Sequence, residues 1–137
     1  MEGQSRRSAS QGALSVDLQV PPTPSMLSEA RRVLCELPLP DPVLEDAQLL
    51  VSELVSNSIR HAGLAPDDRI QVKAAVARGR LRVDVLNPSR AGEPRLAGGI
   101  RPTPGAESGW GLYLVESLAT NWGYGKGRYW FELDLRT

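Results

Sequence analysis

Three polar side chains that can do chemistry follow one another at four-residue intervals, as Glu53, Asn57 and His61. Because residues four apart are neighbours on an α-helix, the three would form one row along a helix face. A carboxylate can accept a proton from a hydroxyl group, and an amide oxygen can bind a hard cation such as Mg²⁺ together with phosphates and water. The row therefore predicts a cleft suited to proton transfer and cation binding.

Each member of the row also has a purely structural interpretation. Glu53 would be a solvated helix residue paired with Arg60 or another arginine. Asn57 is a poor helix former, so something keeps it in the helix, and capping a neighbouring backbone group would be enough. His61 lies near the predicted helix end, where the helix dipole favours a protonated ring without any ligand. No cluster of histidines or cysteines accompanies it, which argues against zinc.

A second motif, Gly109-Trp110-Gly111, stands before an apolar stretch that starts at Leu112. Glycines let the backbone approach a ligand closely, and the first amide groups of a helix have no partners within it. Such amides suit a phosphate chain. A tight turn from loop to helix explains the same residues equally well. The sequence contains no P-loop motif, and no G-x-G-x-x-G follows an early strand.

The helix that carries the polar row is predicted over residues 41–63, opened by Asp41-Pro42 and closed by Gly63. Its apolar side chains recur at intervals of three and four, and they are Val43, Leu44, Ala47, Leu50, Val51, Leu54, Val55 and Ile59. At about 100° per residue, the polar row lies on the border of this stripe. We therefore expect the row at the edge of the core.

The remaining elements follow from the same periodicities. Strands are predicted at residues 14–20, 70–76, 81–85, 122–124 and 128–135, and further helices at 23–36 and 109–120. The last helix is expected to bury Leu112, Val115, Leu118 and Ala119. This order predicts an α+β fold, a two-layer α/β sandwich with a mixed, mostly antiparallel sheet and helices on one face. Residues 87–108, rich in proline and glycine, predict a long functional or disordered loop.

Composition limits the possible functions. The 137 residues fit one domain, expected over residues 13–137, and residues 1–12 have almost nothing to bury and predict a disordered tail. Formal net charge is zero, so no general attraction to nucleic acid or to a membrane is expected. No apolar run approaches the ~20 residues that span a bilayer, and no secretory signal is present. We therefore expect a cytoplasmic protein.

Taken in order, these motifs resemble the GHKL ATP-binding fold. The chain is most similar to the small single-domain branch of anti-sigma-factor serine-protein kinases and their actinobacterial relatives, over residues 14–135. Residues 50–62, LVSELVSNSIRHA, match the asparagine box of that branch nearly throughout. Gly109-x-Gly111-Leu112, followed by Leu114-Val115-Glu116, matches its second glycine box. Residues 130–133, WFEL, resemble its final strand.

The resemblance implies roles for the helical row. Glu53 matches the general base that activates a water or a serine hydroxyl. Asn57 matches the Mg²⁺ ligand that bridges to the phosphates of ATP. Arg60 and His61 match residues beside those phosphates.

The resemblance also implies a phosphate-contacting turn and a mobile lid. Residues 90–108 correspond to the ATP lid, and their glycines suit a loop that rearranges on binding. The further nucleotide-binding residues are Asn87, Gly99, Gly109, Trp110, Gly111 and Leu112.

Three positions depart from the pattern of the family. Asn87 stands where an aspartate usually accepts a hydrogen bond from the adenine amino group. An amide oxygen can still accept, but its NH₂ could also face a guanine carbonyl, so the base preference is open. Either Arg128 or Tyr129 replaces a threonine close to the base, and Trp110 replaces an arginine between the two glycines.

Two functions are therefore weighed. The first is an ATP- and Mg²⁺-dependent kinase that phosphorylates a serine of an anti-sigma-factor antagonist and also sequesters a sigma factor, with a homodimer as one expectation because relatives often dimerise. The second is a nucleotide-weak, degenerate relative that only holds a sigma factor or an antagonist. Asn87 favours the second.

Overall fold

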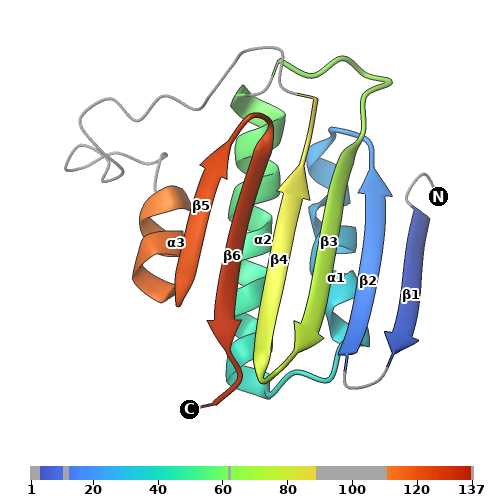
Figure 1. Ribbon diagram of the computed structural model, residues 1–137. Coiled ribbons are helices and arrows are strands. Elements are labelled where there is room, and N and C mark those ends of the chain that lie inside the picture. The colour runs from blue at the N-terminus through green and yellow to red at the C-terminus, as the bar shows by residue number, and fades with distance from the viewer. Residues whose placement is uncertain (1–3, 11–12, 62, 89–110, 137) are drawn as a thin grey trace.

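The computed structural model describes residues 4–10, 13–61, 63–88 and 111–136. One six-stranded sheet, in the order β1-β2-β3-β4-β6-β5, carries α1 and α2 on one face, with α3 beside β5 (Figure 1). The strands are β1 (Gln4–Ser10), β2 (Ala13–Val20), β3 (Ile70–Ala77), β4 (Arg80–Leu86), β5 (Asn121–Gly125) and β6 (Arg128–Asp134). Every pairing between these strands is antiparallel. The predicted α+β two-layer sandwich is confirmed.

Strand β1 differs from the disordered tail expected for residues 1–12. Its backbone pairs with β2 along its whole length, from Gln4 opposite Gln19 to Ser10 opposite Ala13. An edge strand is held by backbone hydrogen bonds to one neighbour, and these require no apolar side chain. The composition of residues 1–12 indicates only how much apolar surface they can bury, so it does not predict this strand.

The first helical segment and α2 begin at the predicted proline signals. The first helical segment comprises a 3₁₀ turn (Pro24–Met26), α1 (Leu27–Val33) and a second 3₁₀ turn (Leu34–Glu36). Helix α2 (Asp41–His61) has 21 residues and is therefore about 31 Å long. Helix α3 is shorter, Gly111–Leu118. None of the helices in the described ranges is both long and apolar enough to cross a membrane.

The core lies between α1, α2 and the inner face of the sheet. Alternate residues of the four central strands point into it and are at most 5% exposed, namely Val16, Leu18, Val20, Ile70, Val72, Ala74, Leu81, Val83, Val85, Tyr129, Phe131 and Leu133. Helix α2 contributes Val43, Ala47, Leu50, Val51, Leu54 and Val55, while Leu44 and Ile59 are only partly buried.

Helix α3 buries less than expected. Leu112 and Val115 join the core, but Leu118 is 38% exposed and Ala119 is partly buried. The prediction for Leu118 is wrong because α3 lies at the edge of the sheet, beside β5 and against α2, where fewer elements cover a helix than cover α2.

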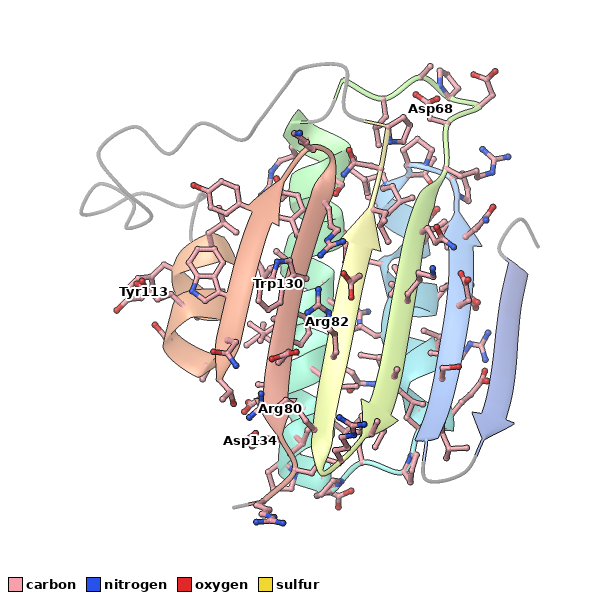
Figure 2. The ribbon with its side chains drawn as sticks, in the orientation of Figure 1. Asp68, Arg80, Arg82, Tyr113, Trp130 and Asp134 are labelled. Atoms are coloured by element: carbon pink, nitrogen blue, oxygen red, sulfur yellow. The ribbon has the colours of Figure 1, made fainter. Side chains whose placement is uncertain are left out.

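The outer face of the sheet carries charged side chains in ion pairs (Figure 2). Across strands, Arg80 Nε of β4 lies 2.9 Å from Asp134 Oδ1 of β6, and along β4 Arg82 Nε lies 2.9 Å from Asp84 Oδ1. The Arg82 guanidinium also stacks 4.3 Å from the ring centre of Trp130. Such a face is typical of an antiparallel sheet with one side in water, and each exposed ion pair stabilises the fold only slightly. A shallow hollow of about 810 Å³ lies on this face, away from the helices.

Gly123 leaves room for the indole of Trp130, its antiparallel partner in β6. A Cβ at Gly123 would lie 2.6 Å from Trp130 Nε1, so either the ring or the strand would have to move. We expect Gly123→Ala to lower the free energy of unfolding by about 1–3 kcal/mol, measured by urea denaturation.

Two comparisons separate this clash from a backbone effect. In Gly79→Ala the new Cβ would meet no atom within 4 Å, but residue 79 has a φ of +74°. We expect the free energy of unfolding to fall by only about 1–2 kcal/mol, because of the left-handed backbone at this residue. In a Trp130→Thr background the loss from Gly123→Ala should shrink. An equal loss with and without the indole would disprove the clash.

Candidate functional site

The polar row lies on the C-terminal half of α2. Asn57 is buried at 7% exposure, Glu53 is half-buried and Arg60 is exposed. Arg60 folds back along its own helix, where Nη2 donates to Asn57 Oδ1 at 3.0 Å and Nη1 donates to Ser56 Oγ at 2.9 Å. Arg60 is therefore paired with Asn57 and Ser56 and not with Glu53, which removes one structural interpretation of Glu53.

The amide oxygen of Asn57 can bind a cation while it accepts the hydrogen bond from Arg60. An amide oxygen carries two lone pairs, and the bond from Arg60 uses one of them. Within the described ranges, no group of three His, Cys, Asp or Glu side chains could hold a metal ion. A Mg²⁺ at Asn57 would therefore complete its shell with phosphate oxygens and water, as this ion commonly does. The residues present fit that arrangement.

Asn87 follows β4 and meets α2 through Ser58. Its Nδ2 donates to Ser58 Oγ at 2.8 Å, and its backbone N–H donates to the Gly127 carbonyl at 2.8 Å. The Asn87 Oδ1 atom is buried and has no hydrogen-bond partner among the residues that the structure describes. A buried acceptor without a partner destabilises a protein by about 1–3 kcal/mol, so a ligand that donates a hydrogen bond there would be favoured.

Ser58 was not singled out by sequence reasoning. Its side chain is fully buried, one residue beyond Asn57. The available signal was a hydroxyl group inside the apolar stripe of α2, because a buried polar group usually has a hydrogen-bond partner. That partner, Asn87, lies 29 residues away, and periodicity along one helix does not identify it.

The structure decides which of two residues on β6 faces the helices. Tyr129 points to the inner face and is 5% exposed, whereas Arg128 points outward and lies 3.3 Å from Asp84. Burial raises the pKa of the Tyr129 phenol, and the nearby charge of Arg60 acts in the opposite direction. Of the two, Tyr129 is thus the residue on the side of the sheet that faces α2, within reach of the charge of Arg60.

Because the pKa of Tyr129 is raised in the folded protein, the protein should become less stable in strong alkali. Tyrosine in the unfolded chain ionises near pH 10, whereas the folded chain keeps the Tyr129 proton above that pH. The unfolded state then binds fewer protons, so the free energy of unfolding falls as the pH rises above about 10. Tyr129→Phe should make this fall shallower in denaturation experiments. Tyr113→Phe, which replaces a tyrosine on α3 that is not among the groups acting on Tyr129, should not. Equal slopes in wild type and Tyr129→Phe would contradict the assignment.

Several predicted site residues lie outside the described ranges. These are Gly99, Gly109 and Trp110, together with the whole expected lid at residues 90–108. His61 is the last residue of α2, and its side chain is not described. Gly111 begins α3, and Leu112 behind it is buried in the core.

An antiparallel sheet with helices on one face, and the polar row on one of those helices, is the arrangement expected for the GHKL fold. The chain belongs to the histidine kinase-like ATPase domain family, which it matches over residues 20–130. The predicted resemblance to the GHKL fold is thereby confirmed. Among curated protein sequences, none matches this chain.

The chain is also similar to a solved structure, the RsbU and RsbW domains of Rv1364c from Mycobacterium tuberculosis. The TM-score is 0.54 and the sequence identity is 21%. The match covers 88% of this chain and 32% of that chain, so this chain spans about a third of its length. At this identity the likeness establishes the shared fold.

Proposed function

We propose that the protein binds ATP with Mg²⁺ and phosphorylates a serine of a partner protein in the cytoplasm. The partner class is an anti-sigma-factor antagonist, and the protein also sequesters a sigma factor. Membership of the histidine kinase-like ATPase family supports the nucleotide. The observation that carries the proposal is the buried, unpartnered Oδ1 of Asn87, a residue whose Nδ2 donates to Ser58, which follows Asn57 on α2.

In this proposal three residues of α2 have one task each. Glu53 accepts the proton of the serine hydroxyl. The serine oxygen forms a bond to the γ-phosphorus of ATP as the bond between that phosphorus and the β-phosphate oxygen breaks. Asn57 Oδ1 would hold Mg²⁺, and the ion when bound would neutralise charge on the phosphates. Arg60 exchanges its contacts with Ser56 and Asn57 for phosphate oxygens, which a guanidinium binds more strongly because the bonds are charge-assisted.

A second candidate function is a protein-binding module that binds nucleotide weakly. Two positions favour it. Asn87 replaces a carboxylate, and the loss of charge assistance weakens a hydrogen bond by about 1 kcal/mol or more. Tyr129 places a buried phenol where similar proteins carry the smaller threonine.

Calorimetric titration with ATP and Mg²⁺ separates the two functions. Micromolar binding by the wild type would support the kinase, and phosphate transfer to an antagonist protein would then be measured directly. Binding only by Asn87→Asp would support the protein-binding module. Absence of binding in both proteins would overturn the nucleotide site.

A further inference from the structure

The outer face of the sheet is low over two strands and high over the next two. Over β2 and β3 it carries the small side chains of Ser15 and Ala75, which are cross-strand neighbours. In the next strand Arg82 stands opposite Ala75, and its guanidinium stacks on Trp130 of β6 (Figure 2). The hollow of about 810 Å³ includes the small residues in its lining, and Arg82 lies at its side. The face therefore has a hollow over β2 and β3 beside a ridge over β4 and β6.

Two charged side chains that line the hollow have no ion pair. Lys73 of β3 stands between Asp17 of β2 and Asp84 of β4 in the register of the sheet. In the part of the chain that the structure describes, the exposed Lys73 ammonium has neither a hydrogen bond nor an ion pair. Asp17 accepts from the neutral amide of Gln71 at 2.9 and 3.0 Å, and no cation among the described side chains lies within ion-pair distance of it. The hollow thus carries one open positive charge and one open negative charge.

A second copy of this face fits the first when the two are related by a two-fold axis parallel to the strands. With the axis between β3 and β4, β3 of one copy faces β4 of the other, β2 faces β6, and each ridge enters the opposite hollow. Lys73 then faces Asp84 of the other copy, because both residues lie beside the axis in the same row of the sheet. Asp17 faces Trp130, on which Arg82 of that copy stacks. Sheets that pack face to face are about 10 Å apart, a gap that these long side chains can bridge.

We propose that the outer face of the sheet is a dimer interface and that its occupant is a second copy of this chain. Across it Lys73 pairs with Asp84 and Asp17 pairs with Arg82, so both open charges are neutralised, and the two-fold symmetry makes each contact twice. The six strands, about 4.8 Å apart and about seven residues long, cover about 650 Å² in projection, near the ~800 Å² that each partner buries in a standard interface. The dimer needs no nucleotide. It is more specific than the homodimer expected from the resemblance, because its face, axis and contacts are defined.

The test measures the oligomeric state of the full chain by sedimentation equilibrium at micromolar concentrations, without nucleotide. We expect a reversible dimer for the wild type. Lys73→Glu should weaken the dimer at least about tenfold, because two carboxylates then meet at each contact and like charges across an interface are unfavourable. Asp84→Lys should also weaken it, because two ammonium groups then meet. An equimolar mixture of the two variants should dimerise like the wild type, since the introduced glutamate of one chain faces the introduced lysine of the other.

Arg78→Glu is the matched control for the change in net charge. Arg78 is exposed in the turn between β3 and β4, outside the proposed contacts, and its replacement changes the charge by the same amount as Lys73→Glu. We expect this variant to dimerise like the wild type. Thermal unfolding verifies that each variant is folded. Lys73→Glu replaces an exposed side chain without partners among the described residues, so it tests the face even if Asp84→Lys does not fold.

Three results would overturn the proposed dimer. The first is a wild-type protein that stays monomeric over the whole micromolar range. The second is a dimer that Lys73→Glu does not weaken, and the third is a pair of folded, monomeric variants whose mixture does not dimerise. Because these measurements contain no nucleotide, none of the three results bears on the proposed ATP site, which the titrations with ATP test separately.

Discussion

Glu53→Gln is expected to slow phosphoryl transfer to a serine substrate by a factor of about 10²–10⁴, with ATP affinity nearly unchanged. The amide has the shape of the carboxyl group but cannot take up the hydroxyl proton. Glu53 precedes Asn57 by one helical turn and is half-buried, so it lies beside the proposed Mg²⁺ ligand and can still reach a hydroxyl. Single-turnover transfer of labelled phosphate measures the rate, and calorimetry measures the affinity.

The matched control for Glu53 lies two turns earlier on the same helix. Glu45 is exposed, and Glu45→Gln removes the same charge without touching the row. We expect it to transfer phosphate at the wild-type rate. A Glu53→Gln protein that is equally active would show that Glu53 is only a solvated helix residue.

Asn57→Ala is expected to weaken Mg²⁺-dependent ATP binding by at least about a hundredfold. Loss of a residue that merely orients a metal ligand lowers metal affinity about 10–100-fold, and Asn57 is proposed to be the ligand itself. The substitution removes the amide oxygen that accepts from Arg60 and would bind the cation. Titrations with ATP in Mg²⁺ and in a chelator measure the effect, because affinity should rise with Mg²⁺ in the wild type and stay constant in the variant.

Asn121→Ala provides the comparison for an exposed asparagine. Its side chain, on β5, donates to Glu132 Oε1 of β6 at 3.1 Å, and we expect its loss to leave the Mg²⁺ dependence intact. If Asn57→Ala kept the Mg²⁺ dependence, Asn57 would serve only to hold Arg60. Because Asn57 is buried, a denaturation experiment verifies that the Asn57→Ala protein is folded, since an unfolded protein would also fail to bind ATP.

The order of the elements followed from local patterns because each pattern acts within one segment. Alternation of apolar residues marks a strand whose two faces differ, as in β4, where Leu81, Val83 and Val85 are buried. Proline after a capping residue marks a helix start, as at Pro24 and Asp41-Pro42. Strand β1 lacks such a pattern, and its pairing depends on the neighbouring β2 backbone.

The sequence by itself determined the row on α2, because helix geometry alone brings residues four apart, such as Glu53 and Asn57, to one face. It could not determine the partner of Asn87 or the side to which Tyr129 points. The partner of Asn87 depends on how the end of β4 packs against α2, because Ser58 and Asn87 are 29 residues apart in the chain. The side to which Tyr129 points depends on the register of β6 against β4, since a shift of one residue would turn every side chain of the strand to the other face. Tertiary packing therefore decided the surroundings of Asn87 and Tyr129, at the base end of the proposed site, whereas the spacing along one helix was enough to predict its phosphate end.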